Sequence, residues 1–135
     1  MSIIVQKFGG TSVANAEKIH RAARRAIKAK LSGKQVVMVV SAMGHTTDEL
    51  VALAKEVSPN PPKREMDMLL TTGEQVSISL MAMALEGAGH QAISFTGGQI
   101  GMVTDASHTK ARIRSIDADR IHQELNTGKV VIVDG

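Results

Sequence analysis

Hydrophobic residues in this chain group into three short runs, separated by stretches with helical periodicity. The runs cover residues 3–5, 36–40 and 130–133, and they are continuous and rich in Val and Ile. Such runs are typical of strands that are buried on both faces of a parallel sheet. A weaker strand is predicted over residues 91–96, and a further short strand, part of a hairpin, near residues 112–116.

Four stretches between these runs have the pattern of helices: residues 15–31, 47–57, 63–87 and 117–126. Asn15, a Thr at the start of the second stretch and Asp117 are the predicted N-caps. Pro62 is predicted at the first position of the third helix. Gly73, inside that helix, predicts either a bend or the close approach of another backbone.

The alternation of strands and helices predicts an α/β domain with a mostly parallel sheet sandwiched between helices. The last predicted strand is followed only by Asp134 and Gly135. A central strand in such a sheet is normally followed by a loop and a covering helix. We therefore expect this chain to be part of a longer fold, truncated after a strand; the alternative is that the last strand forms an edge of the sheet.

Composition narrows the functional classes. The 135 residues include no Cys, which excludes disulfides and Cys-based metal sites, and the simple expectation is a cytoplasmic protein. Only two residues are aromatic, Phe8 and Phe95, too few for base stacking on single-stranded nucleic acid. The net charge of +3 comes from a basic helix, for which a solvated face is favoured over a nucleic-acid site. Polar residues interrupt the apolar stretch 66–85, so no membrane span is predicted.

Candidate chemistry lies where the predicted strands end, because open α/β sheets bind ligands at the carboxyl ends of their strands. Lys7 lies within the first strand, which ends at Phe8, and Gly9, Gly10, Thr11 and Ser12 lead from that strand into a helix. Backbone N–H groups in such a loop, a helix N-terminus and a lysine together suit a phosphate group. The alternative is an ordinary Gly-Gly turn beside a solvent-exposed lysine.

Three further residues are candidates for binding a small ligand. Glu74 is the only charged residue between Asp67 and Glu86, so a buried position would require a cation or a hydrogen-bond donor beside it. Ser41 and Thr47 flank the loop after the second strand and have hydroxyls suited to a ligand carboxylate. The alternatives are an exposed position for Glu74 and simple turn or cap roles for the two hydroxyls. The five His residues have no metal-ligand spacing, and no metal site is predicted.

Several ordered blocks of the sequence resemble the aspartate kinases, which are members of the amino acid kinase family. The opening block is Lys-Phe-Gly-Gly-Thr-Ser-Val at residues 7–13, and the second is Val-Val-Ser-Ala-Met-Gly at residues 39–44. The third is Arg-Glu-Met-Asp-Met-Leu-Leu-Thr-Thr-Gly-Glu at residues 64–74. Ser-Phe-Thr-Gly at residues 94–97 and the strand at residues 130–133 also fit in order, so the resemblance covers the whole chain.

The resemblance implies transfer of the γ-phosphoryl group of ATP, accompanied by Mg²⁺, to the β-carboxylate of L-aspartate. This reaction is the first step toward lysine, threonine, methionine and diaminopimelate. Lys7 and residues 9–12 would contact the phosphoryl group, Ser41 and Thr47 would line the aspartate pocket, and Glu74 would pair with the α-amino group.

The family's members are roughly three times longer than this chain. We therefore expect residues 1–135 to be the amino-acid-binding lobe, inactive alone, without the nucleotide-binding lobe or the regulatory ACT domains. Where this chain has Asp134 the family usually has a small residue, and a carboxylate there would be unfavourable near phosphates. The expected partners are L-aspartate and ATP, with either a homo-oligomer or a second chain that supplies the missing lobe.

Three alternatives to an aspartate kinase stay open at this point. One is another amino acid kinase that forms an acyl phosphate, acting on glutamate or acetylglutamate. Another is a non-catalytic module that binds an anion or a nucleic acid through the basic helix. The third is a non-functional remnant.

Overall fold

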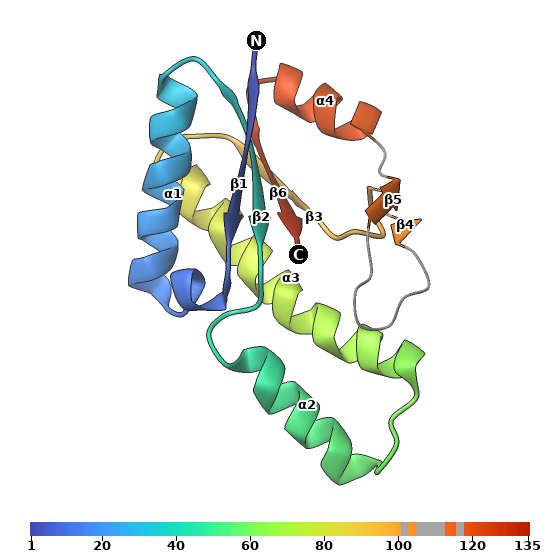
Figure 1. The fold of residues 1–135 in the computed structure, drawn as a ribbon. Helices are drawn as coiled ribbons and strands as arrows, with labels where there is room; N and C mark the ends of the chain where they lie inside the picture. The colour runs from blue at the N-terminus through green and yellow to red at the C-terminus, as the bar shows by residue number, and fades with distance from the viewer. Residues whose placement is uncertain (101–102, 105–112, 116–117) are drawn as a thin grey trace.

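A computed structural model of the chain describes residues 1–100, 103–104, 113–115 and 118–135 (Figure 1). A four-stranded parallel sheet has the order β1-β2-β6-β3. Its strands are β1 (Ile3–Phe8), β2 (Gln35–Val40), β3 (Ala92–Phe95) and β6 (Val130–Asp134). The predicted α/β class with a parallel sheet is therefore confirmed.

The helices fall within about a residue of their predicted bounds, while the Asp117 cap lies outside the described residues. They are α1 (Ala16–Leu31), α2 (Thr46–Val57), α3 (Lys63–Gly87) and α4 (Ala118–Asn126). The sequence pattern does not predict the short 3-10 helix η1 (Gly10–Val13). The predicted hairpin is also present, formed by β4 (Val103–Thr104) and β5 (Ile113–Ser115), which pair antiparallel.

The last strand, β6, lies inside the sheet, between β2 and β3. Its residues Val130–Asp134 are all buried. Val37 pairs with Val131 on one side, and Ile93 pairs with the same residue on the other side. The alternative that the last strand forms a sheet edge is therefore wrong, because both of its edges are hydrogen-bonded to neighbouring strands.

The first strand, β1, differs from its prediction. It was expected to be buried on both faces, but its burial alternates, and Ile3 and Val5 are 39% and 61% exposed. Two features explain the difference. β1 lies at an edge of the described sheet, and the sheet face that carries Val5 and its neighbour Val37 is covered only in part by the short helix α4. A run of β-branched residues predicts a strand but not its place in the sheet.

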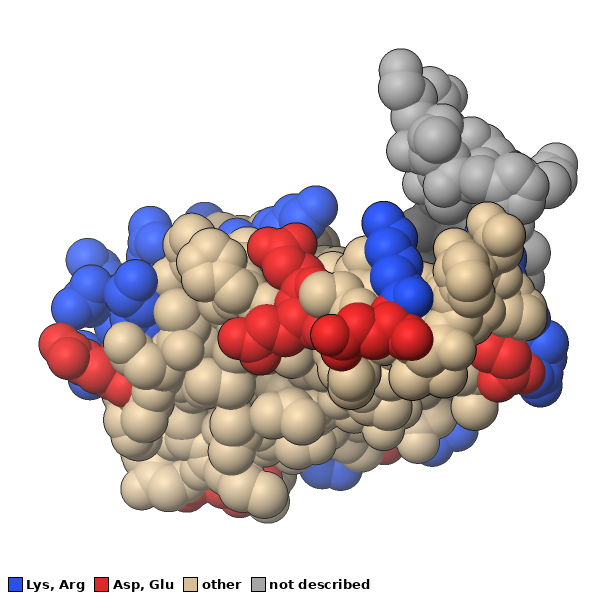
Figure 2. All heavy atoms as spheres, turned by 90° about the horizontal axis from the view of Figure 1, so that it is seen from below, with Lys and Arg blue, Asp and Glu red and all other residues tan. Residues whose placement is uncertain are grey.

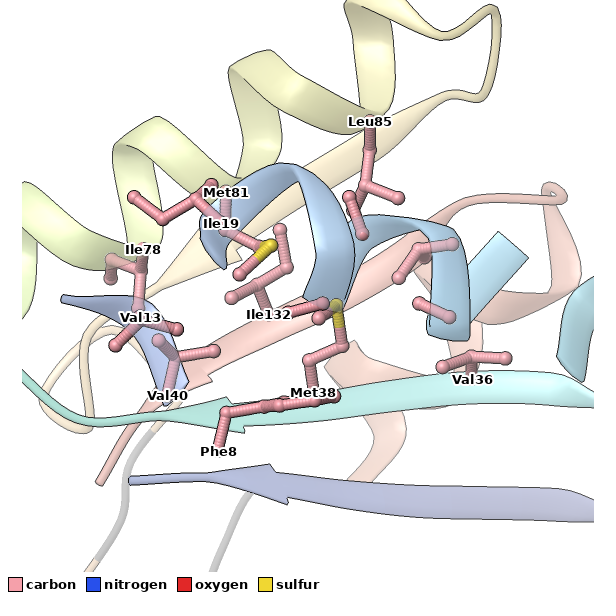
Figure 3. Close-up of a cluster of buried hydrophobic side chains, with 14 residues drawn as sticks. Phe8, Val13, Ile19, Val36, Met38, Val40, Ile78, Met81, Leu85 and Ile132 are labelled. Carbon is pink, nitrogen blue, oxygen red and sulfur yellow. The ribbon is translucent and has the colours of Figure 1, made fainter. Parts of the chain in front are cut away.

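The larger hydrophobic core lies between the sheet and the two helices α1 and α3 (Figure 3). Ile78, Met81 and Leu85 point from α3 toward the sheet, and Met38 of β2 and Ile132 of β6 meet them. A smaller core lies on the opposite face of the sheet, where Leu125 of α4 packs near Phe95 and Val131. The sheet is thus a layer between helices, as predicted.

The helix caps confirm one prediction and correct two. The Asn15 side chain accepts a hydrogen bond from the Lys18 N–H at 2.9 Å, as an N-cap does. The predicted Thr cap of α2 is wrong, because His45 occupies the cap position without a side-chain hydrogen bond. Pro62 is the cap residue of α3 rather than its first residue.

The helix α3 is long and apolar enough to cross a membrane by length and composition alone. Only 28% of its most apolar 18-residue stretch is buried inside the fold. Its inward side nevertheless packs against the sheet, and a helix of a soluble core passes the same test. The prediction that residues 66–85 do not span a membrane stays a prediction.

Candidate active site at the carboxyl ends of the strands

The four parallel strands end at one rim of the sheet, and backbone hydrogen bonds connect the segments that follow them. The Ser41 N–H donates to the Phe8 carbonyl at 3.1 Å, and the Gly135 N–H donates to the Val40 carbonyl at 3.1 Å. The Gly97 N–H donates to Oδ1 of Asp134 at 2.8 Å. These bonds hold the ends of β1, β2, β6 and β3 side by side, which is where an open α/β sheet binds its ligand.

The two glycines after β1 have different roles. A Cβ on Gly10 would lie 2.9 Å from the Gly44 carbonyl oxygen and 3.0 Å from that of Ala42, both of them backbone atoms. The Gly44 N–H also donates to the Gly10 carbonyl at 2.9 Å. A Cβ on Gly9 would meet nothing within 4 Å, and its φ of −75° suits any residue. Gly10 is therefore required by the close approach of the loop after β2, whereas Gly9 leaves open space in front of the backbone.

The loop Gly9–Ser12 lies between a lysine and a basic helix. Lys7, Thr11 and Ser12 are exposed, and the Lys18 ammonium group donates to the Thr11 carbonyl at 3.0 Å. Behind the loop lies a cavity of about 310 Å³, lined in part by Phe8, Lys18, Arg21 and Arg25. The loop thus presents backbone and hydroxyl groups in a strongly positive region, as a phosphate site requires.

Ser41 reaches the end of the last strand. Its hydroxyl donates a 2.6 Å hydrogen bond to the Gly135 carbonyl, next to Asp134. Thr47, by contrast, is exposed in the first turn of α2, and its neighbour Thr46 is the residue that contacts α3 at Gly73. The structure therefore brings Ser41 to the centre of the rim and leaves Thr47 on the surface beside it.

Gly73 explains how α3 reaches this rim. A Cβ there would lie 3.1 Å from Cγ2 of Thr46 and 3.3 Å from Cβ of Ala42. The expected close approach is present, but the atoms that approach Gly73 belong to side chains and not to another backbone. The helix α3 is continuous through Gly73, and the missing side chain lets it touch the loop after β2. Glu74 is the next residue of α3, so it also lies near the loop after β2.

Two carboxylates meet where α3 passes the end of β6. Burial and, to a smaller extent, the negative charge of Asp134 together raise the pKa of Glu74 from 4.5 to about 7. Burial also raises the pKa of Asp134, although its hydrogen bond from the Gly97 N–H opposes that effect. In the described part of the chain, no Lys, Arg or His forms an ion pair with Glu74. The described residues thus supply no cation for Glu74, and a second carboxylate, Asp134, lies nearby instead.

Sequence reasoning singled out Asp134 only as an unfavourable charge near phosphates, and it did not predict the pairing with Glu74. Glu74 and Asp134 are 60 positions apart, and only the crossing of α3 over the sheet brings them together. Sequence reasoning missed the hydrogen bond from Gly97 for the same reason. In residues 1–100 and the described segments beyond them, no group of three His, Asp or Glu could hold a metal ion.

Comparison with known proteins agrees with this architecture. The family model described as "Amino acid kinase family" matches residues 2–135. This chain belongs to the amino acid kinase family. An aspartokinase from Bacillus sp. (strain MGA3) is 59% identical over 135 residues, which cover all of this amino acid kinase chain and 33% of that protein. The chain therefore spans about a third of the length of this curated relative.

Solved structures of aspartate kinases have the same fold as this chain. The aspartate kinase from Synechocystis is 49% identical, with a TM-score of 0.84 over 99% of this amino acid kinase chain and 22% of that protein. Aspartokinase III from E. coli, solved in complex with aspartate and ADP, is 23% identical, with a TM-score of 0.80. The match covers 100% of this chain and 40% of the aspartokinase III chain, and at this identity it supports the fold alone.

Proposed function

We propose that this chain is the amino-acid-binding lobe of an aspartate kinase, which transfers the γ-phosphoryl group of ATP to the β-carboxylate of L-aspartate. The observation that carries the proposal is Glu74, a half-buried carboxylate without a cationic partner among the described residues. It lies at the same rim as Ser41 and the loop Gly9–Ser12. The name and 59% identity of the Bacillus aspartokinase support aspartate as the substrate.

The α-ammonium group of L-aspartate is the cation that Glu74 lacks. A positive charge beside a half-buried carboxylate stabilises its ionised form, so substrate binding would lower the pKa of Glu74 again. Asp134, at the end of β6, would add a second negative charge to the ammonium pocket. The hydroxyls of Ser41 and Thr47 are the candidate donors to a substrate carboxylate.

The transferred phosphoryl group would bind at the other end of the site, beside Lys7 and the loop Gly9–Ser12. An oxygen of the substrate β-carboxylate attacks the γ-phosphorus of ATP, the new C–O–P bond forms, and the bond to the β-phosphate oxygen breaks as ADP leaves. No protein nucleophile is needed, because the substrate supplies the attacking oxygen. Lys7, the N–H groups of Gly9, Gly10 and Thr11, and the hydroxyls of Thr11 and Ser12 would stabilise the charge on the transferred group.

The expected Mg²⁺ has no set of ligands in the described part of this lobe, so we expect the nucleotide and the missing lobe to hold it. The adenine pocket would likewise belong to the remainder of a kinase, since the chain spans 33% of its aspartokinase relative. We therefore expect the 135-residue chain to bind L-aspartate without phosphorylating it, either as a homo-oligomer or beside a second chain that supplies the nucleotide lobe. We expect a protein with this function to be cytoplasmic.

Calorimetric titration of the chain with L-aspartate at pH 7 tests the proposal. Because Glu74 titrates near pH 7, an ammonium ion that binds beside it should release about half a proton. The observed enthalpy should therefore differ between two buffers with different enthalpies of ionisation. Succinate, which has both carboxylates but no ammonium group, is the matched control and should release no proton.

Substitutions test the role of Glu74 in binding the substrate ammonium group. Glu74→Gln should abolish both the binding of L-aspartate and the proton release, whereas Glu56→Gln on the exposed side of α2 should change neither. Tighter binding of L-glutamate or N-acetyl-L-glutamate than of L-aspartate would favour another kinase of this family. Binding of succinate as tight as that of L-aspartate would contradict the role of Glu74.

A further inference from the structure

Two carboxylates, those of Asp134 and Glu74, lie where the apolar layer between β6 and α3 reaches the rim. Side chains alternate along a strand, so Asp134 is on the same face of β6 as Ile132, which packs in the larger core. Glu74 precedes Ile78 by four residues, and this spacing places it on the side of α3 that faces the sheet. Figure 3 shows Ile78 and Ile132 in the layer between α3 and the sheet. Asp134 and Glu74 therefore face the same space at its end.

The loop after β2 connects the end of β6 with α3. Asp134 pairs with Val40 in the register of β6 and β2. Ala42 follows two residues later, and a Cβ on Gly73 of α3 would lie 3.3 Å from its Cβ. These contacts place Glu74, the next residue of α3, beside the end of β6. Burial raises the pKa of Glu74 most, and the charge of Asp134 raises it too, as expected for two nearby carboxylates.

The described fold supplies no cation to this pair of carboxylates. Asp134 accepts a neutral donor, the Gly97 N–H, at 2.8 Å. None of the ion pairs between described residues includes Asp134 or Glu74. Figure 2 views the molecule from the side on which the strands end, and blue side chains gather there over α1, whereas red side chains lie over the middle. The rim is thus basic beside α1 and acidic where α3 passes β6.

We propose that Asp134 is a specificity-determining residue, which together with Glu74 selects ligands with a free ammonium group over analogues with a neutral group in its place. This role lies at the ammonium end of the L-aspartate site, so the inference rests on the proposed function. An ammonium group has a full positive charge and three N–H donors, and it can donate to both carboxylates at once. A hydroxyl has one donor and no charge, so it would leave the two like charges uncompensated.

Calorimetric titration of the 135-residue chain at pH 8, where most of Glu74 is ionised, compares L-aspartate with L-malate. L-malate has a hydroxyl in place of the ammonium group and is otherwise the same molecule. Asp134→Asn removes the charge and keeps an oxygen that can accept the Gly97 N–H. We expect this variant to lower the preference for L-aspartate over L-malate at least about tenfold, because one charge-assisted hydrogen bond is lost. Asp119→Asn, the same change at an exposed position of α4, is the matched control and should leave the preference unchanged.

Asp134→Ala is a second variant, which removes the charge and the hydrogen bond from Gly97 together. It should lose the preference to the same extent as Asp134→Asn, and circular dichroism should show both variants folded. If Asp134→Asn keeps the preference and Glu74→Gln loses it, the role of Asp134 is overturned and the proposed function stands. Equal binding of the two ligands by the native chain, or binding of neither, would overturn both.

Discussion

Glu74 provides the sharpest test of how the fold positions the site. Replacement by Gln keeps the shape of the protonated side chain and removes its titration. The unfolded chain loses the Glu74 proton near pH 4.5, whereas the folded chain keeps it to about pH 7. Between these values the unfolded state binds fewer protons than the folded state. The free energy of unfolding should therefore fall as the pH rises from 4.5 to 7.

The size of this effect follows from the same two values. A tenfold change in proton affinity corresponds to about 1.4 kcal/mol, so a pKa raised from 4.5 to about 7 corresponds to roughly 3.5 kcal/mol at most. Glu74 is only half-buried, and solvent screens part of its charge. We therefore expect Glu74→Gln to stabilise the chain by about 1–3 kcal/mol at pH 8 and hardly at all at pH 4.

Urea denaturation followed by circular dichroism, repeated at several pH values from 4 to 8, measures this difference. Glu56→Gln, an exposed substitution on α2, is the control and should shift stability by less than about 0.5 kcal/mol, without a trend across pH 6–8. Equal pH dependence of the native chain and Glu74→Gln would refute the reasoning. It would mean that Glu74 is hydrated and that α3 does not bring it against the end of β6.

Three further predictions concern stability. Gly10→Ala should cost about 1–3 kcal/mol, because its Cβ would lie 2.9 Å from a backbone oxygen, whereas Gly9→Ala should be nearly neutral; urea midpoints compare the two. Ser77→Ala should stabilise the chain by about 1 kcal/mol, since its buried hydroxyl has no hydrogen-bond partner among the described residues, while the exposed Ser79→Ala should not; a gain of equal size in both variants would contradict this explanation. Asn15→Ala should cost about 1 kcal/mol in thermal unfolding, because it removes the cap of α1, and an unchanged melting temperature would show that the cap contributes nothing.

Much of the fold followed from local patterns. Continuous β-branched runs, helical spacing and the Asn15 cap depend on neighbours in sequence, so they predicted the strands, the four helices and the parallel class. Blocks such as residues 7–13 and 64–74 also predicted the family. Lys7, the loop 9–12 and Ser41 lie at the strand ends as predicted, since parallel strands end at a common edge.

Tertiary structure alone decided which of these residues meet. The exposure of Val5 depends on where β1 lies in the sheet, and no property of the run itself encodes that position. Gly10 and Gly73 look alike as glycines in the sequence, yet each is required by a backbone or side chain brought close from another element. The pairing of Glu74 with Asp134 depends on α3 crossing the end of β6. Contacts between residues far apart in sequence arise from packing, and local propensity carries no information about them.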